Sequence, residues 1–220
     1  NSGKIVHLIP PNITEKNFIE QIMSSKSEII ICSDNAKKDF LNFKTEIPIF
    51  EFSTVISKST KNKNTSEIND IAYLIYTSGT TGEPKGVPIS HNMVEFTTKN
   101  MINVLGYSNL DVNIIPLPLH HSFGLGCLHA SIQVGATTVL LKNANDLEYV
   151  LKALKEFKAT TLAAVPPTLT KFLKFDMNSL NNYFSNIRLI ITNSTQIPKN
   201  TVKEFKQILK KGNLATYYGL

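Results

Sequence analysis

The sequence predicts an α/β protein with largely parallel sheets flanked by helices. Short apolar runs rich in β-branched residues alternate with segments of helical periodicity along nearly the whole chain. In the 220 residues, the hydrophobic share of 42% and the charged share of 18% are those of an ordinary globular protein. We therefore expect buried strands with helices packed on their faces.

The first part of the chain opens with this alternation. In chain order, the expected elements are a strand over 5–9, a helix over 14–24, a strand over 28–32, a buried strand over 71–76 and a helix over 90–105. The lysine- and asparagine-rich segment between the third and fourth of these elements is expected to be a solvated loop.

The second part continues the pattern. Strands are expected over 112–116, 137–141, 160–165, 187–192 and 214–218, with helices over 127–134, from Asp146 and from Pro198. The helix from Asp146 places Leu147, Val150, Leu151, Leu154 and Phe157 on one face. Pro166 and Pro167 are expected to end the strand before them, and Gly212 to cap the last helix.

The formal net charge of +6 is compatible with nucleic-acid binding, but the distribution of charge argues against it. Only one of the 23 basic residues, Arg188, is an arginine, and the others are spread along the chain. We expect no nucleic-acid partner, no transmembrane segment and, since Cys32 and Cys127 lie far apart without metal spacing, a cytoplasmic protein with no bound metal at these residues.

A glycine- and hydroxyl-rich segment is the most informative motif. Residues 76–86 read YTSGTTGEPKG, which combines flexible glycines, hydroxyl donors and the cation of Lys85. Such a segment after a strand and before a helix predicts a phosphate-binding loop beside a helix start. The triphosphatase phosphate loop is excluded, because Lys85 follows Gly82 by three positions and precedes Gly86. A plain surface turn is the remaining alternative.

A second motif, PLPLHHSFGL over 116–125, follows a predicted strand. Its histidines are therefore expected at the carboxyl end of a strand, where open α/β sheets bind ligands. Neighbouring side chains of an extended segment point in opposite directions, which argues against a shared metal ion. Two histidines satisfied by backbone hydrogen bonds are the structural alternative.

From Tyr76 to Val87 the sequence resembles the signature loop of the adenylate-forming (AMP-binding) ligases, which include acyl- and aryl-CoA synthetases and peptide-synthetase adenylation domains. The resemblance implies a loop that closes over the pyrophosphate end of ATP. It implies nucleotide contacts at Thr77, Ser78, Gly79, Thr80, Thr81, Gly82 and Lys85. It also implies that Lys85 and His121 are the catalytic residues.

The same resemblance implies the other parts of the site. Pro118, His121 and Gly124 match the Pro-x-x-His-x-x-Gly pattern of acyl- and aryl-activating members, so His121, Phe123 and Gly124 are the expected substrate contacts. Members that activate amino acids usually carry an aspartate there, so the expected substrate is a carboxylic acid without an α-amino group.

The resemblance places the adenine contacts in two segments. Ser194 and Thr195 stand at the turn where the family usually has glycine and alanine, a departure that leaves these contacts open, with a plain Asn/Ser turn as the alternative. Tyr217, Tyr218, Gly219 and Leu220 begin the family's Tyr-Gly-x-Thr-Glu motif. Its glutamate, which holds Mg²⁺, would follow Leu220.

The resemblance further implies that the chain is part of a larger amino-terminal domain. The expected organisation is an α/β subregion over 1–60, a polar linker over 61–69 and a core ATP-binding subdomain over 70–220, with the carboxy-terminal domain absent. We expect this chain by itself to have little or no ligase activity.

The implied whole enzyme is an ATP-dependent carboxylic acid:thiol ligase that uses ATP, Mg²⁺ and either CoA or a phosphopantetheine arm. Its implied partners are a small-molecule carboxylic acid and an acyl carrier protein. The alternatives are a peptide-synthetase adenylation module and a non-catalytic nucleotide-binding or scaffold protein.

Overall fold

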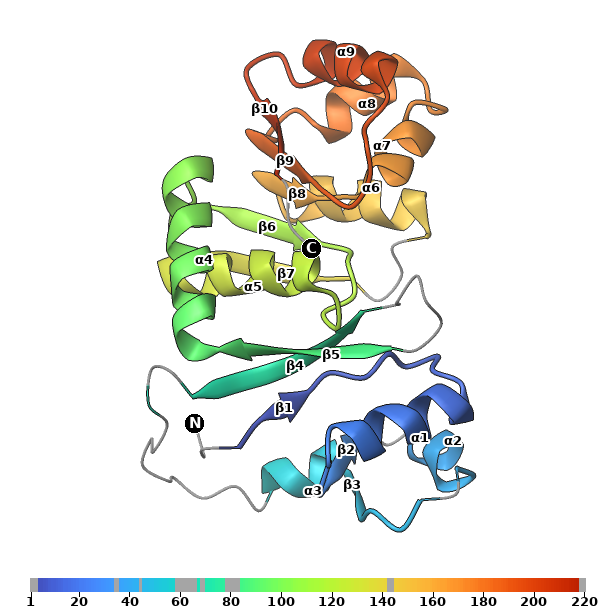
Figure 1. The fold of residues 1–220 in the computed structure, drawn as a ribbon. Helices are drawn as coiled ribbons and strands as arrows, with labels where there is room; N and C mark the ends of the chain where they lie inside the picture. Colours follow the sequence, from blue (N-terminus) through green and yellow to red (C-terminus); the bar gives the residue numbers. More distant parts are fainter. Residues whose placement is uncertain are drawn as a thin grey trace. The chain divides into compact units, whose positions relative to one another are not determined.

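The computed structural model of the chain (Figure 1) describes residues 4–33, 36–43, 45–57, 67, 70–77, 84–141 and 145–217, with the side chains of 38, 39 and 57 excepted. The residues form two compact units, 1–93 and 94–220. The predicted linker over 61–69 lies almost entirely outside the described residues, so the predicted subdivision of the chain stays a prediction.

The first unit combines two small sheets with three described helices. Its elements in chain order are β1 (Val6–His7), α1 (Glu15–Ser24), β2 (Ile30–Cys32), α2 (Lys37–Leu41), β3 (Ile49–Glu51), α3 (Phe52–Ser57), β4 (Ile71–Thr77) and β5 (Lys85–Ser90). One sheet has the strand order β1-β4-β5, and the other pairs β2 with β3 in parallel.

Helix α1 forms where the sequence predicts it. Thr14 precedes the first turn, and its side-chain oxygen accepts a hydrogen bond from the backbone N–H of Asn17, at 3.4 Å. Phe18 and Ile22 lie on the buried face one turn apart. They pack with Ile30, Cys32 and Phe40, so this small core joins α1 to the β2–β3 sheet.

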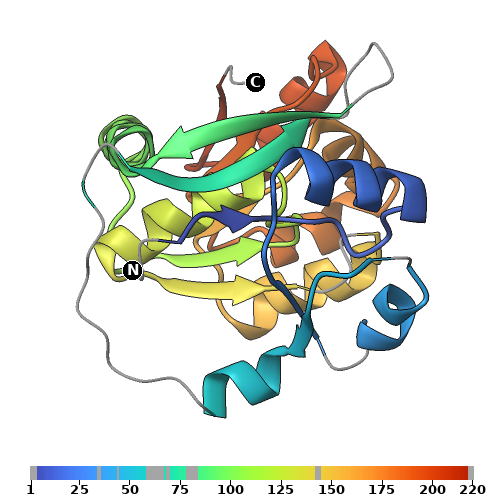
Figure 2. The ribbon, with the colours of Figure 1, turned by 60° about the horizontal axis from the view of Figure 1, so that its bottom comes forward.

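The strand over 71–76 is present as β4, but the expectation of a strand–loop–helix unit is wrong. β5 lies between the loop and the next helix and pairs with β4 in antiparallel fashion, with Thr77 opposite Lys85 and Ile71 opposite Ser90. β4 and β5 run side by side as a hairpin in Figure 1 and Figure 2. The helix that follows Ser90 therefore starts at the other end of the hairpin from the loop, where its dipole does not serve a bound phosphate. β4 is also half-buried rather than buried.

The second unit is a parallel sheet covered by helices. Its elements are α4 (His91–Leu105), which begins at the end of the first unit, β6 (Val112–Ile115), α5 (Ser122–Val134), β7 (Thr137–Leu140), α6 (Leu147–Glu156), β8 (Thr161–Ala163), α7 (Pro166–Phe172), α8 (Met177–Tyr183), β9 (Leu189–Thr192), α9 (Lys199–Ile208) and β10 (Asn213–Thr216). The five strands have the order β10-β9-β8-β6-β7, and every pair is parallel. This confirms the predicted fold class.

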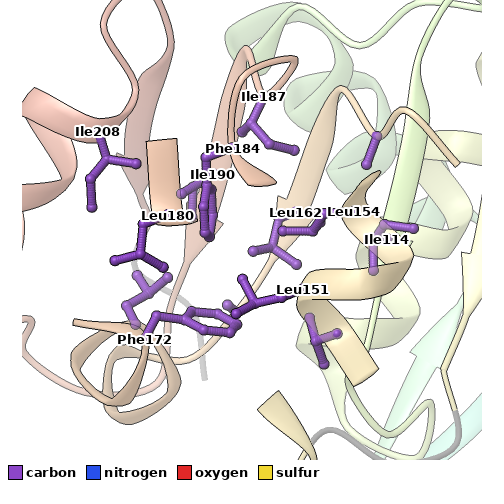
Figure 3. Packing of buried hydrophobic residues seen from close by; sticks show 14 of the residues in the cluster. Ile114, Leu151, Leu154, Leu162, Phe172, Leu180, Phe184, Ile187, Ile190 and Ile208 are labelled. Atoms are coloured by element: carbon purple, nitrogen blue, oxygen red, sulfur yellow. The ribbon is translucent and has the colours of Figure 1, made fainter. Parts of the chain in front are cut away.

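The two faces of this sheet have separate cores. On one face, Ile114, Leu162 and Ile190 from successive strands pack against residues of α6 to α9, as Figure 3 shows. On the other face, Ile115 and Ile191 pack with residues of α4 and α5, such as Met101 and Cys127. Alternate strand residues thus point to opposite faces. From β6 the chain moves to β7 on one side, and it then crosses back to β8 on the other side of β6. Because the crossovers share one hand, connections that run in opposite directions along the sheet lie on opposite faces.

A buried ion pair joins the amino ends of the strands. The Asp111 side chain is only 2% exposed, and its two oxygens accept hydrogen bonds from Arg188 Nε at 2.8 Å and Nη2 at 2.5 Å. Thr160 Oγ1 and the Ser108 N–H also donate to this carboxylate. Burial by itself would raise the pKa of Asp111, but these hydrogen bonds outweigh it and lower the pKa. The contacts tie together the residues that precede β6, β8 and β9.

Two local expectations, at Gly212 and at Phe157, are wrong. Gly212 does not cap α9, whose cap is Leu209; a glycine is needed there because a Cβ would lie 2.5 Å from the carbonyl oxygen of Ile187. Pro166 does follow a strand, but it also opens α7, since proline fits the first helical position. Phe157 is 43% exposed and lies beyond the end of α6. No described helix has both the length and the apolar character needed to span a membrane.

Candidate active site

Most of the predicted site residues in the second unit lie at or near the carboxyl ends of its strands. β6 ends at Ile115, β9 at Thr192 and β10 at Thr216, and the parallel register brings these ends to one edge of the sheet. The segments that follow these three strands are 116–121, 193–195 and Tyr217. The reversal of strand order falls between β6 and β8, and open α/β sheets bind ligands at the carboxyl ends of the strands at such a point.

His121 lies at this edge, immediately before the first turn of α5. Its backbone is extended (φ −104°, ψ 142°), and its exposed side chain makes no capping hydrogen bond to the helix. The imidazole is therefore available to a ligand beside the free N–H groups of a helix start.

The expectation that the two histidines point in opposite directions is wrong. The rings of His120 and His121 lie 4.3 Å apart, centroid to centroid, because the chain turns at this point and the N–H of His121 bonds to the carbonyl oxygen of Pro118. Burial, and then the neighbouring His121, lower the pKa of His120.

Phe123 and Gly124 lie in the first turn of α5, directly after the segment that carries His120 and His121. Phe123 is 5% exposed, and its ring meets that of Tyr217 edge to face, with centroids 5.7 Å apart. Gly124 is required by a close approach, since a Cβ there would lie 2.8 Å from the carbonyl oxygen of Pro118. Their roles as substrate contacts stay predictions.

The turn after β9 reaches the same edge. Ser194 has a left-handed backbone (φ 88°) and is exposed, as is Thr195. The side-chain oxygen of Asn193 accepts a hydrogen bond from the Ser194 N–H. Burial raises the pKa of Tyr217 to about 12, and the neighbouring Asn193 side chain opposes this rise.

Two residues at this edge were not among the predicted site residues. The sequence marks Asn193 only as part of an Asn/Ser turn, and nothing in the sequence shows that its side-chain oxygen accepts the Ser194 N–H. The Thr192 hydroxyl is buried and has no hydrogen-bond partner among the residues that the structure describes. Its position as the last residue of β9 was the one available signal.

In the first unit, the β4–β5 hairpin presents Thr77 and Lys85 at its loop end. The two residues pair with each other and both are exposed. Within the described part of the chain, Lys85 forms no ion pair. Ser78, Gly79, Thr80, Thr81 and Gly82 lie outside the described residues, as do Tyr218, Gly219 and Leu220.

Tyr76 attaches the loop end of this hairpin to α1. Its hydroxyl donates to the carbonyl oxygen of Gln21 at 3.2 Å and hydrogen-bonds the Ser24 hydroxyl, while its ring stacks on His7 at 4.6 Å. Gly86 lies over the ring, and a Cβ there would come within 2.9 Å of it. The hairpin that contains Thr77 and Lys85 is therefore attached to α1.

The donor set fits a polyphosphate better than it fits a metal ion. An exposed lysine without an ion pair beside a hydroxyl residue suits phosphate oxygens. The described residues hold no cluster of three or more histidines, cysteines or carboxylates that could bind a metal ion.

The chain belongs to the AMP-binding enzyme family, whose sequence model matches residues 2–220. This confirms the family that the signature loop and the histidine motif predict.

Its curated relatives are named as CoA ligases or synthetases. Acyl-CoA synthetase 7 of Caenorhabditis elegans is 25% identical over 100% of this chain and 45% of its own length. The 2-succinylbenzoate–CoA ligase of Oceanobacillus iheyensis is 26% identical over 99% of the chain and 45% of the relative. The chain thus spans less than half the length of these curated relatives.

Solved structures share the fold. Apo MatB from Rhodopseudomonas palustris has a TM-score of 0.86 at 19% identity and aligns with 98% of this chain and 44% of its own. VinN in complex with L-aspartate has a TM-score of 0.81 at 21% identity, over 96% of this chain and 55% of its own.

Proposed function

We propose that this chain supplies the ATP-binding and acid-binding residues of an AMP-forming carboxylic acid:thiol ligase. In this reaction a carboxylate oxygen attacks the α-phosphate of ATP, which forms an acyl-adenylate and releases pyrophosphate. A thiol then takes the acyl group and releases AMP. The thiol belongs to CoA or to a pantetheine arm of a carrier protein, and the names of the curated relatives favour CoA.

His121 is assigned to the acid. Its exposed imidazole stands at the carboxyl edge of the sheet, where it can orient a carboxylate or stabilise the charge that develops as the oxygen attacks. Phe123 and Gly124 hold the loop that carries it. Ser194, Thr195 and Tyr217, at the same edge, are assigned to the adenine end of the nucleotide, together with Tyr218, Gly219 and Leu220.

Thr77 and Lys85 are assigned to the β- and γ-phosphates, together with Ser78 through Gly82 of the same loop. Lys85 would neutralise charge on the phosphates, which is the main demand of phosphoryl chemistry besides positioning. Tyr76 attaches the strands that carry Thr77 and Lys85 to α1.

The observation that carries the proposal is the gathering of His121, Ser194 and Tyr217 at the switch point of a parallel sheet in a chain of the AMP-binding enzyme family. Titration calorimetry with ATP tests it. We expect saturable binding that Lys85→Ala weakens about tenfold or more, because a charge-assisted contact is lost. Lys206→Ala, which removes an exposed lysine of α9, is the matched control and should bind like the unaltered chain. Absence of saturable binding would refute the proposal.

An amino acid is the second candidate substrate, because VinN, whose fold this chain shares, is recorded with L-aspartate. Against it, no carboxylate stands at positions 120–124 to pair with an amine. Succinate and L-aspartate differ only in the amino group and form a matched pair of probes. With ATP present, we expect a saturating signal from succinate that His121→Ala removes and a weaker one from L-aspartate. The reverse order would favour the amino acid.

A further inference from the structure

His7 of β1 contacts two residues at the junction between α1 and the β4–β5 hairpin. Its Nε2 lies 3.2 Å from the side-chain oxygen of Gln21 in α1, and its ring stacks on Tyr76 of β4 with centroids 4.6 Å apart. The amide oxygen of Gln21 can only accept a hydrogen bond, so Nε2 carries a proton and donates it. In the neutral imidazole, Nδ1 is then the nitrogen without a proton.

The Nδ1 atom of His7 is buried and has no hydrogen-bond partner among the residues that the structure describes. Without a proton, this nitrogen loses only the hydrogen bond that water would donate to it. A proton at Nδ1 would instead place a cationic N–H donor in a site without an acceptor, which costs considerably more. Burial lowers the pKa of His7, and the bond to Gln21 offsets only part of this effect. The surroundings therefore fit the neutral imidazole and disfavour the cation.

The groups in contact with the imidazole are uncharged. α1 presents the amide of Gln21, and β4 presents the phenol of Tyr76, which is the titratable group in contact with His7. Among the described residues, no charged group contributes to the pKa of His7. The charged residues of α1 are exposed, namely Glu15, Lys16 and Glu20. Protonation of His7 would therefore create a positive charge that no neighbouring carboxylate compensates.

Gln21 joins this imidazole to the loop end of the hairpin. Its side-chain oxygen accepts from His7, and its backbone carbonyl oxygen accepts from the Tyr76 hydroxyl at 3.2 Å. The Tyr76 ring is thus held at its hydroxyl by α1 and by stacking on His7. The residue that follows Tyr76 is Thr77, which pairs with Lys85. A movement of the Tyr76 ring would therefore displace this adjacent pair.

We propose that His7 is a positioning residue for ATP and that it acts as the neutral imidazole: through Gln21 and the Tyr76 ring, it fixes the end of the hairpin that carries Thr77 and Lys85. This inference rests on the proposed function, which assigns these two residues to the phosphates. Protonation of His7 weakens ATP binding, because the cation disrupts this arrangement. His7 acts through its neighbours, so it is not assigned a catalytic role.

An NMR titration of the imidazole with and without saturating ATP tests the inference and needs no substitution. If ATP prefers the neutral form, it must lower the pKa of His7 by the same factor by which protonation lowers the affinity. We expect this pKa to fall by about 0.5, which corresponds to an affinity difference of about threefold. The negative charge of ATP alone would raise the pKa of a nearby histidine, so the two effects have opposite signs. His129, a half-buried histidine of α5, is the internal control, and its pKa should not fall.

Two substitutions at position 7 separate the hydrogen bond from packing. His7→Leu keeps a side chain of similar bulk but removes the donor to Gln21, and it should weaken ATP binding about fivefold at pH 7.5. His7→Gln offers an amide NH₂ group near the position of Nε2, and it should bind ATP within about twofold of the unaltered chain. His129→Gln is the matched control and should not change the affinity.

Urea unfolding shows whether each variant is folded. If His7→Leu does not fold, His7→Gln and the titration of the unaltered chain decide.

The outcomes separate this inference from the proposed function. If the unaltered chain does not bind ATP, the proposed function fails and this inference fails with it. If the chain binds ATP while the pKa of His7 stays constant or rises, the inference alone is refuted. It is also refuted if His7→Leu binds ATP as tightly as the unaltered chain, or if His7→Gln loses as much affinity as His7→Leu.

Discussion

At the scale of single residues, the candidate site depends on close approaches that only small or specific side chains allow. Gly124 shows this most clearly, since the carbonyl oxygen of Pro118 occupies the place that a Cβ would need. The sequence pattern includes Gly124, but its spacing does not show that Gly124 contacts the histidine loop itself.

Gly124→Ala should destabilise the chain by about 2 kcal/mol, the usual cost of forcing an extra carbon into a packed site. It should also displace the His120–His121 loop and weaken the binding of a carboxylate. Urea unfolding measures the first effect, and titration with succinate in the presence of ATP measures the second.

Gly126→Ala is the matched control, because a Cβ there would meet only Met101 Sδ at an ordinary 3.5 Å. Alanine is favoured over glycine inside a helix, so this variant should be as stable as the unaltered chain or up to about 1 kcal/mol more stable. Equal effects at 124 and 126 would contradict the close approach to Pro118.

At the scale of elements, the parallel sheet could be predicted and the hairpin could not. The strands of the second unit are short runs of apolar residues, and Asp146 caps its helix through the N–H of Tyr149 as its residue type suggests. β5 begins Lys-Gly-Val-Pro, a run of residues mostly poor in β propensity. It forms because it lies at the edge of its sheet beside β4, where proline is tolerated. A local sequence pattern does not show pairing of this kind with another strand.

The attachment of the hairpin to α1 gives a prediction at this scale. Tyr76→Phe keeps the ring that packs on Gly86 and His7 but removes the hydroxyl that bonds to α1. We expect a loss of about 1 kcal/mol in the free energy of unfolding, the net value of a typical hydrogen bond. Tyr183→Phe, which alters a tyrosine of α8 in the second unit, should have a smaller effect. Equal losses from the two substitutions in urea unfolding would contradict the anchor.

At the scale of the whole molecule, three half-buried histidines set the pH dependence of stability. Burial lowers the pKa of His7, His120 and His129 below the usual 6.5; a hydrogen bond with Gln21 partly offsets this at His7, and His121 adds to it at His120. Below 6.5 the unfolded chain therefore binds more protons than the folded chain, and stability falls as the pH decreases. Asp111, whose pKa is also lowered, contributes only at a more acidic pH, where unfolded aspartate begins to protonate.

The midpoint of urea unfolding should accordingly be lower at pH 5.5 than at pH 7.5. Asparagine at positions 7, 120 and 129 should flatten this dependence, since it removes the three groups that take up protons on unfolding. A midpoint that stays constant or rises toward pH 5.5 in the unaltered chain would show that these histidines are not buried as described.

The position of several candidate residues at the ends of strands was predictable, and their mutual arrangement was not. His121, Ser194 and Tyr217 follow from motifs, because the carboxyl ends of parallel strands are a known place for ligands. The side-by-side histidines, the left-handed Ser194 and the ring contact between Phe123 and Tyr217 all depend on contacts between residues far apart in sequence or on a local turn. A sequence read alone does not specify such contacts.

The central proposal, that this chain binds ATP, is tested most directly by NMR. Backbone ¹H–¹⁵N spectra recorded with and without ATP report which residues sense the ligand. We predict the largest shifts at Thr77 and Lys85 and at Ser194, Thr195 and Tyr217, with Asp111 and Arg188, at the opposite edge of the sheet, unchanged. Shifts confined to the Asp111–Arg188 edge, or no shifts at saturating ATP, would contradict the account.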